Sequence, residues 1–220
     1  MEHILLVFLV LILKMTDMDN LLNKIAKADF SKIFVNKGYA YFTKGKYNLN
    51  IIGVRRSGTR VTNQFDDYIV VRYTDMYGID STEIFPATTD PGLSSMIKPI
   101  DSKGCAILAE GQYRGTWKIG YHQGKYEALV QRKPVKVYRD NNKDAKYDFD
   151  PKTIDEGVFG INIHKAGNAS TIINGWSAGC QVLQRTVNFN KLMKLAHYQV
   201  SQGHGDTFTY TLINEEDLDE

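Results

Sequence analysis

The chain has 220 residues, of which 43% are hydrophobic and 24% are charged, and its formal net charge at pH 7 is +2. This length and apolar content suffice for one domain with a substantial core. Two cysteines exclude a disulfide-stapled scaffold and a four-cysteine zinc site. Basic residues are spread along the chain rather than massed, so we expect no nucleic-acid partner.

The chain begins with a run of ten apolar residues at 4–13. Ten helical residues span about 15 Å, which is too short for a hydrocarbon core of about 30 Å. The run has the length of the apolar region of a signal peptide but lacks a basic flank and a small-residue cleavage site. Export or membrane association through residues 4–13 and a docked terminal helix both stay open.

The pattern after this run changes from helical to strand-like. Asp17 or Asp19 can cap a helix whose apolar residues recur at spacings of three and four up to Phe34. From residue 38 onward, short apolar runs are separated by Gly, Asn and Asp, which is typical of many short strands. The predicted strands lie at 47–54, 68–73, 106–108, 116–119, 128–130, 135–138, 160–164, 171–173 and 207–213.

These elements predict a mainly β (α+β) fold, with one β-sandwich or barrel-like domain at 38–214. A hydrophobic segment and helix at 1–37 precede the domain, and an acidic tail at 215–220, expected to be solvated and mobile, follows it. The segment 85–92 contains two prolines and a glycine, so we expect a stiff loop there, beside a cleft.

Residues 160–164, Gly-Ile-Asn-Ile-His, alternate apolar and polar side chains, so His164 is expected to face away from the two isoleucines. The turn-rich loop that follows can return Cys180 to the side of His164. An imidazole beside a thiol activates it, because a free thiol with a pKa of about 8.5 is mostly protonated at pH 7. The apolar spacing from 182 to 196 predicts a helix directly after Cys180, whose dipole would favour the thiolate. A buried structural cysteine and histidine are the alternative.

The combination of His164 with Ser-Ala-Gly-Cys at 177–180 resembles the signature of the L,D-transpeptidase (YkuD-type) catalytic domain, in a divergent group found in phage and bacterial proteins. The resemblance implies a mainly β fold and a thioacyl-enzyme formed from peptidoglycan stem peptides, with transfer to an amine or to water. It implies Cys180 as nucleophile, His164 as base, Ser177 as a supporting residue, and Gly179 with Cys180 as oxyanion donors. We predict no metal and no cofactor, and a location in the cell envelope or periplasm, outside the cell, or on a phage.

The family's arginine or asparagine downstream of the cysteine is missing here, so substrate recognition needs other residues. Arginine forks bind carboxylates, and the loop at 120–127 between two predicted strands can line a cleft. For the loop, the alternative is an ordinary hairpin with an exposed histidine. For the arginine, the alternative is a solvated side chain at the surface. Five residues are assigned to substrate contacts: Arg55, His122, Tyr126, Trp176 and Gln181.

Two other functions remain as alternatives. A non-catalytic cell-wall-binding or virion structural protein would leave the His/Cys pair buried or without a role. A zinc peptidase needs three protein ligands around an open site. Its candidate ligands are His122, His164, His197, His204 and Asp206.

Residues 140–148 carry side-chain oxygens at alternate positions, as a calcium loop does. Ala145 replaces the usual turn glycine and Pro151 replaces the bidentate glutamate, so an ordinary polar loop is the favoured interpretation. Cys105 lies in an apolar run that predicts a buried strand, and a bridge between Cys105 and Cys180 would consume the predicted nucleophile.

Overall fold

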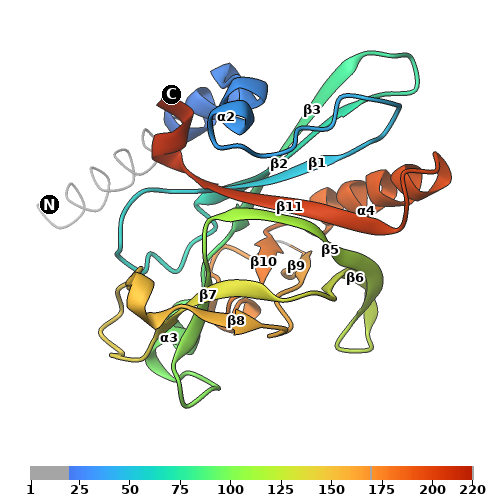
Figure 1. Cartoon of the computed structure of the whole chain (residues 1–220). Coiled ribbons are helices and arrows are strands. Elements are labelled where there is room, and N and C mark those ends of the chain that lie inside the picture. Colours follow the sequence, from blue (N-terminus) through green and yellow to red (C-terminus); the bar gives the residue numbers. More distant parts are fainter. Residues whose placement is uncertain (1–19, 169, 220) are drawn as a thin grey trace, which may run out of the picture.

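The structure is a computed structural model that describes residues 20–168 and 170–219. It is a mixed α/β domain built mostly of strands around a closed eight-stranded barrel (Figure 1), which confirms the mainly β prediction. The apolar run at 4–13 and the predicted caps Asp17 and Asp19 lie outside the described residues. In the described part, helices are too short or too polar to cross a membrane.

Around the barrel the strands follow the order β1, β11, β5, β6, β9, β10, β3, β2. Neighbouring strands are antiparallel except for β1 with β11 and β9 with β10, which are parallel. The bounds are β1 (Asn50–Arg55), β2 (Asp67–Thr74), β3 (Asp80–Thr88), β5 (Gly111–His122), β6 (Tyr126–Gln131), β9 (Ile163–Lys165), β10 (Gln181–Leu183) and β11 (Thr207–Asn214).

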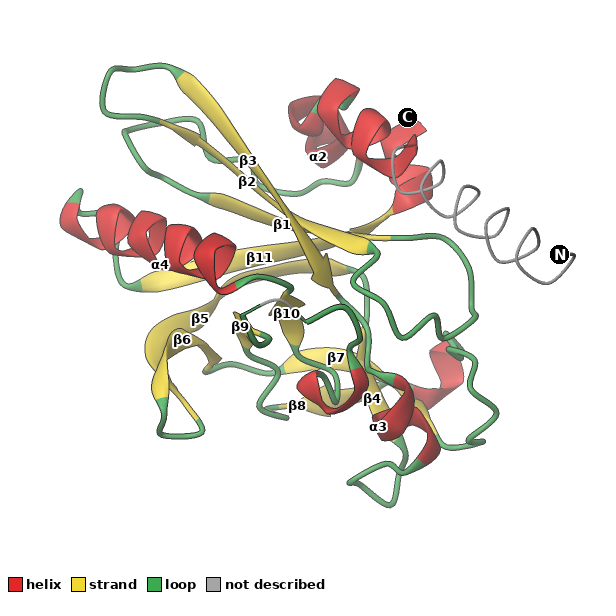
Figure 2. Ribbon diagram, turned by 180° about the vertical axis from the view of Figure 1, so that it is seen from behind, coloured by secondary structure: helices red, strands yellow, loops and turns green. Residues whose placement is uncertain are grey.

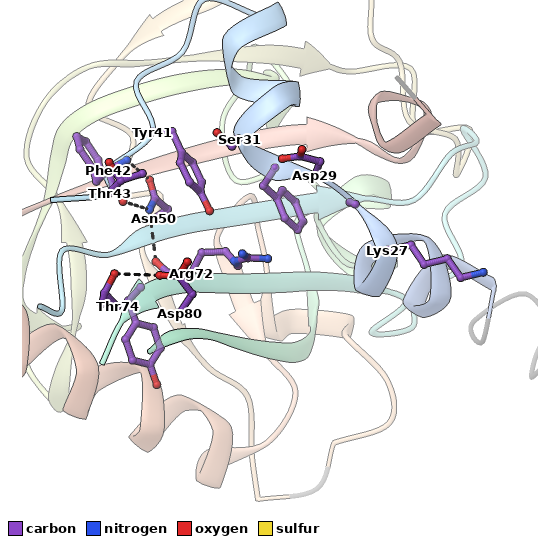
Figure 3. Close-up of a pocket in the computed structure, with 13 residues that line it drawn as sticks. Lys27, Asp29, Ser31, Tyr41, Phe42, Thr43, Asn50, Arg72, Thr74 and Asp80 are labelled. Atoms are coloured by element: carbon purple, nitrogen blue, oxygen red, sulfur yellow. Dashed lines mark hydrogen bonds between the residues drawn. The ribbon is translucent and has the colours of Figure 1, made fainter. Parts of the chain in front are cut away.

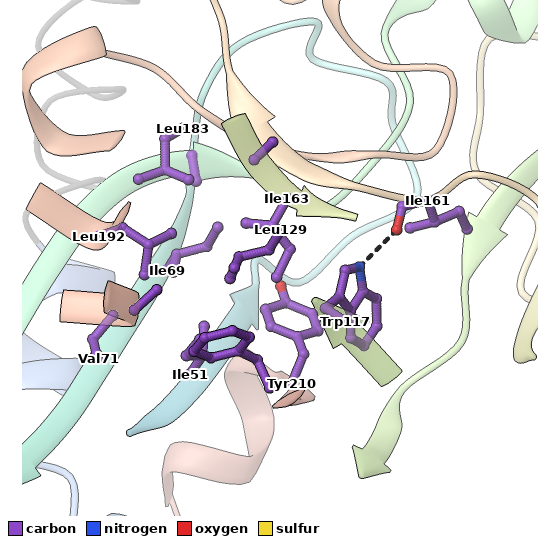
Figure 4. Close-up of a cluster of buried hydrophobic side chains, with 14 of the residues drawn as sticks. Ile51, Ile69, Val71, Trp117, Leu129, Ile161, Ile163, Leu183, Leu192 and Tyr210 are labelled. Atoms are coloured by element: carbon purple, nitrogen blue, oxygen red, sulfur yellow. Dashed lines mark hydrogen bonds between the residues drawn. The ribbon is translucent and has the colours of Figure 1, made fainter. Parts of the chain in front are cut away.

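Apolar side chains from alternate strand positions fill the barrel, because successive side chains of a strand point to opposite faces (Figure 4). Trp117 and Tyr210 are fully buried there and pack edge-to-face, with ring centroids 5.5 Å apart. The indole N–H of Trp117 donates to the carbonyl of Ile161 at 2.8 Å, so its polar atom is satisfied. This bond ties the segment before β9 to the core.

Helix α4 (Thr186–Ser201) packs its apolar face into the same core. Its buried side chains recur at spacings of three and four, as predicted. The predicted start of this helix was wrong, because β10 and two further residues separate it from Cys180. A helix dipole acts within its first turn, so α4 does not supply the thiolate stabilisation expected from the sequence. The buried residues are Phe189, Leu192, Met193, Leu195, Ala196 and Gln199.

On the outside of β1 and β2 lie two helical segments, residues 20–27 and α2 (Phe30–Asn36) (Figure 2). They form a second apolar cluster with Ile52 and Val70, which explains why β1 is buried on both faces. The Asp29 side chain caps α2 by accepting the N–H of Lys32.

The acidic tail was expected to be solvated and mobile, but residues Glu215–Asp219 form the 3-10 helix η3. Its carboxylates pair with basic side chains of the N-terminal helices. Lys37 lies 2.6 Å from Asp217, and Lys24 lies 2.9 Å from Asp219. These ion pairs connect η3 to the helical region at residues 20–37.

A separate three-stranded sheet, β4 (Cys105–Leu108), β7 (Val135–Asp140) and β8 (Asp155–Gly157), lies beside the barrel. Leu108 faces the barrel core, whereas Cys105 faces another apolar cluster that includes Met96 of helix α3 (Leu93–Ile97). Cys105 is thus buried in a strand, as its apolar surroundings predicted. The remaining short elements are the 3-10 helices η1 (Pro151–Thr153) and η2 (Asn174–Trp176).

Two predicted local structures differ from the structure. The first half of the predicted loop 85–92 belongs to β3, where Pro86 pairs with Tyr68 although proline donates no ladder hydrogen bond. Residues 171–173 form no strand; instead the backbone N–H of Ile173 donates to the carbonyl of Asn63.

Candidate active site

Cys180 and His164 are held by the neighbouring parallel strands β9 and β10. Gln181 pairs with Ile163, so Cys180 lies beside Asn162, and the Gln181 N–H donates to the Asn162 carbonyl at 2.9 Å. Ile163 points into the barrel core, so His164 and Asn162 face the other side of the strand. A strand spacing of about 4.8 Å and a rise of about 3.3 Å per residue place the Cα atoms of Cys180 and His164 about 8 Å apart.

The Cys180 thiol is half-buried. Its Sγ accepts the backbone N–H of Asn162 at 3.4 Å and lies 3.5 Å from the Gly160 carbonyl, to which the thiol donates. Burial raises the pKa of Cys180 to about 11, although the N–H of Asn162 opposes the shift. The resting thiol is therefore protonated at neutral pH.

The His164 ring is buried, and its orientation is fixed by a backbone carbonyl. Nδ1 lies 2.9 Å from the carbonyl oxygen of Lys165, which can only accept, so Nδ1 carries the proton and Nε2 is the basic nitrogen. The Tyr126 hydroxyl also donates to the Lys165 carbonyl at 3.3 Å. Burial, and then the neighbouring His122, lower the pKa of His164 to about 4, so the imidazole is neutral.

His122 stacks on His164, with ring centroids 4.0 Å apart. Its state is set by Asn162: the amide oxygen of Asn162 accepts the N–H of Gln131, so the amide nitrogen faces His122 Nδ1 at 3.1 Å. Nδ1 of His122 must then accept, which leaves this imidazole neutral as well. Burial lowers the pKa of His122 in the same direction. The hairpin at 120–127 therefore buries its histidine rather than exposing it.

Asn162 had no role in the sequence-based prediction. It supplies a backbone N–H to Cys180 and a side-chain amide to His122, and so links the thiol to the two rings. The only sequence signal was its position on the same strand face as His164.

The protonation state of the resting thiol predicts how Cys180 reacts with an alkylating reagent. Only thiolate is alkylated, so the rate at Cys180 should rise about tenfold per pH unit from pH 7 to pH 10. Mass spectrometry of the Cys180 peptide after timed iodoacetamide pulses measures this rate. Cys105 is the internal comparison, because burial raises its pKa to about 12. A rate at Cys180 that is constant from pH 6 to pH 9 would indicate a preformed thiolate–imidazolium pair and contradict the assignment.

The turn before Cys180 is closed by Ser177, which is fully buried. Its hydroxyl donates to the carbonyl of Cys180 at 2.8 Å and accepts the N–H of Gly179 at 3.2 Å. The Gly179 N–H is thus engaged within the turn. In the part of the chain that the structure describes, no hydrogen bond uses the N–H of Cys180.

Gly179 has a φ of +122°, and a Cβ atom there would lie 2.4 Å from the carbonyl oxygen of Ala106. We expect Gly179→Ala to lower the free energy of unfolding by about 2–5 kcal/mol, because strain and a clash with backbone add together. Urea denaturation measures the loss. Gly175→Ala is the matched control in the same loop, since nothing lies within 4 Å of its Cβ position. Equal stabilities of the two variants would show that the turn adapts.

A cleft of about 390 Å³ opens on Cys180. Arg139 forms part of its wall and lies over the ring of Phe159 at 4.6 Å. This guanidinium is paired with Asp155 at 3.1 Å and lies 3.5 Å from Asp101. Neither imidazole lines this cleft. The lining residues are Ser95, Ile100, Asp101, Gly104, Cys105, Ala106, Arg139, Val158, Phe159, Gly160, Ile161, Ala178 and Cys180.

The structure brings only some of the predicted substrate contacts near Cys180. Tyr126 and His122 adjoin His164, and Trp176 is exposed on η2. Gln181 points into the barrel, where its amide accepts from the Tyr210 hydroxyl. Arg55 is buried, with Nε 2.8 Å from Oδ1 of Asp90, and does not line the cleft. Arg139, which does line it, was not predicted because its place depends on tertiary packing.

The ligands proposed for a zinc peptidase are dispersed. His197 pairs with Glu127 at 3.1 Å, and His204 lies 2.9 Å from the carbonyl of Lys46. Within residues 20–168 and 170–219, no three His, Cys, Asp or Glu residues are arranged to hold a metal ion.

A larger cavity of about 520 Å³ lies beside α2 and contains neither cysteine nor histidine (Figure 3). Its polar groups bond to one another: the Asn50 amide bonds to both backbone polar groups of Phe42, and Thr74 donates to Asp80 at 3.1 Å. Several of the polar groups of this cavity are therefore engaged within the protein.

No protein-family model matches the sequence, and comparisons with curated proteins and with solved structures find no match.

Proposed function

We propose that the protein is a cysteine-dependent acyl-transfer enzyme with Cys180 as nucleophile and His164 as general base. The observation that supports this most is the hydrogen bond from His164 Nδ1 to the Lys165 carbonyl. This bond leaves Nε2 of the neutral imidazole as the basic atom. His164 lies in β9, which pairs with β10, and β10 begins directly after Cys180.

In the proposed reaction, Sγ of Cys180 attacks a substrate carbonyl carbon while Nε2 of His164 accepts the thiol proton. The C–N bond then breaks, and His164 returns that proton to the leaving amine. An amine or water then attacks the thioester carbonyl carbon while Nε2 of His164 accepts its proton. The C–S bond breaks, and His164 returns the proton to Sγ of Cys180. Both groups start neutral, so proton transfer accompanies attack rather than preceding it.

Two backbone N–H groups support charge development in this scheme. The N–H of Asn162 is directed at Sγ and stabilises the thiolate as it forms. The N–H of Cys180 is the donor that we assign to the oxyanion, because the N–H of Gly179 is used by Ser177.

The substrate class that we propose is the peptidoglycan stem peptide, with hydrolase and transpeptidase activity as the two outcomes. The support is the resemblance carried by His164 and the Ser-Ala-Gly-Cys sequence at 177–180.

Incubation with purified peptidoglycan, followed by analysis of the released and cross-linked muropeptides, tests this function. We expect new products from the intact protein in the presence of 1,10-phenanthroline, which binds transition metals. Products lost with phenanthroline would indicate the zinc peptidase, and no product from folded protein would indicate the non-catalytic wall-binding or virion protein.

A further inference from the structure

The loop that leaves β7 and leads to η1 presents oxygen atoms in the order of a calcium loop. In the twelve-residue calcium pattern, ligands occupy the first, third, fifth, seventh, ninth and twelfth positions, and the seventh ligand is a backbone carbonyl. Counted from the end of β7, the candidate oxygens belong to Asp140, Asn142, Asp144, Lys146 and Asp148.

Ala145 stands at the position where a calcium loop normally has glycine, and the backbone conformation there is compatible with such a loop. Ala145 has a φ of +60°, the left-handed conformation for which a calcium loop normally uses glycine. The loop thus makes the required turn without glycine. Its shape alone does not identify a ligand.

Asp140 supplies the observation that points to a cation. The residue is 1% exposed, and its Oδ2 accepts the backbone N–H of Asp148 at 2.9 Å, so the carboxylate lies inside the loop. Its Oδ1 is buried and has no hydrogen-bond partner among the described residues. Buried carboxylate oxygens are almost always paired, because an unpaired one carries the full cost of desolvation.

The charges around this carboxylate favour the same conclusion. The carboxylates of Asp144 and Asp148 lie close to that of Asp140, and the backbone N–H groups of Asp148 and Asn142 are its nearby donors. The preceding Arg139 does not offset these charges, because it pairs with Asp155. A divalent cation would balance the three carboxylates.

We propose that residues 140–148 bind one Ca²⁺ ion, with the unpaired Oδ1 of Asp140 as the first ligand. The other ligands are the side chains of Asn142, Asp144 and Asp148 and the carbonyl of Lys146. In the described loop, no three acidic side chains are arranged to hold an ion. Ion binding therefore requires the exposed side chain of Asp144 to turn toward Asp140. It also breaks the 2.7 Å bond from the Asn142 amide to Asp148.

The loop joins parts of the molecule that are distant in sequence, so ion binding should stabilise the fold. Tyr147 is buried and donates its hydroxyl to the Pro91 carbonyl at 2.9 Å, and its backbone N–H bonds to Thr59. This inference does not depend on the proposed acyl transfer, and its test requires no substrate.

Calorimetric titration and thermal unfolding of the full chain, after removal of ions with EGTA, test the proposal. We expect one equivalent of Ca²⁺ to bind with a Kd of about 10⁻⁴–10⁻³ M, since the bidentate glutamate is missing. In about 10 mM CaCl₂ the Tm should rise by about 3–10 °C, and equal MgCl₂ should give a smaller rise.

The variants Asp144→Asn and Asp148→Asn should reduce the calcium-induced rise in Tm to below about 1 °C while unfolding normally in EGTA. Asp150→Asn is the matched control, because it removes a neighbouring carboxylate outside the pattern and should keep the full rise. The proposal fails if Ca²⁺ produces neither binding heat nor a rise in Tm. It also fails if MgCl₂ acts equally, or if the two loop variants respond as the control does.

Discussion

Replacement of Cys180 by alanine is expected to lower the rate of product formation from peptidoglycan by at least about 10³-fold. The variant lacks the thiol that forms the thioester, and Cys105 does not replace it, because burial raises the pKa of Cys105 to about 12 and keeps its thiol protonated. Muropeptide analysis under identical conditions measures the loss.

Cys105→Ala is the control for this prediction. Cys105 is buried in β4 and lines the same cleft, so its loss tests whether any thiol there would serve. We expect activity within about threefold of the unmodified protein, because burial raises the pKa of Cys105 to about 12 and keeps its thiol protonated. Equal losses in both variants would point to a structural role for the cysteines.

Replacement of Arg55 by methionine is expected to produce the largest loss of stability, about 3–5 kcal/mol at pH 8. Arg55 is 3% exposed, lies 2.8 Å from Asp90, and donates to the carbonyl of Leu108 at 2.8 Å. Without the guanidinium, the buried carboxylate of Asp90 loses its ion-pair partner while the negative charge of Asp67 still acts on it. The Tm at pH 8 should fall by about 10 °C.

The pH dependence of this loss has a definite sign. Burial raises the pKa of Asp90 to about 7 even beside Arg55. A carboxyl whose folded pKa is raised stabilises the folded state when protonated and loses that contribution as the pH rises through the folded value. The Tm difference between Arg55→Met and the unmodified protein should therefore be smaller at pH 5 than at pH 8.

Two further variants separate charge from packing at this site. Arg55→Met combined with Asp90→Asn should recover part of the lost stability, because one unpaired carboxylate is removed. Arg60→Met changes an exposed arginine and should alter the free energy of unfolding by less than about 0.5 kcal/mol. A Tm difference that is larger at pH 5 would contradict the charge-based explanation.

Much of the fold was predictable because β11 alternates apolar and polar side chains, and because β1 and β2 contain continuous apolar runs. β3 was missed because Pro86 argues against a strand, and β10 because three residues are too few to show a period. The missed β10 also explains why α4 was placed directly after Cys180. Closure of the barrel was not predictable, because alternation gives the faces of a strand but not its neighbours.

The candidate site was predictable to a different degree. The motif singled out His164 and Cys180, which the structure places on adjoining chain segments, whereas Asn162 and Arg139 reach this region through tertiary contacts that no local pattern records. Arg55 was assigned to substrate because arginines bind carboxylates, and the carboxylate that it does bind is the buried Asp90. Sequence alone does not distinguish a buried ion pair from a binding site.

Detection of a covalent acyl-enzyme on Cys180 is the decisive test of the proposed reaction. Protein mixed with an excess of stem peptide is quenched in acid during turnover, and the masses of the intact chain and of its proteolytic peptides are measured. We predict an added mass equal to the acyl portion of the substrate on the peptide that contains Cys180, and interception of this thioester by hydroxylamine as an acyl hydroxamate. Turnover that yields neither the adduct nor the hydroxamate, or an adduct on another residue, would contradict acyl transfer through Cys180.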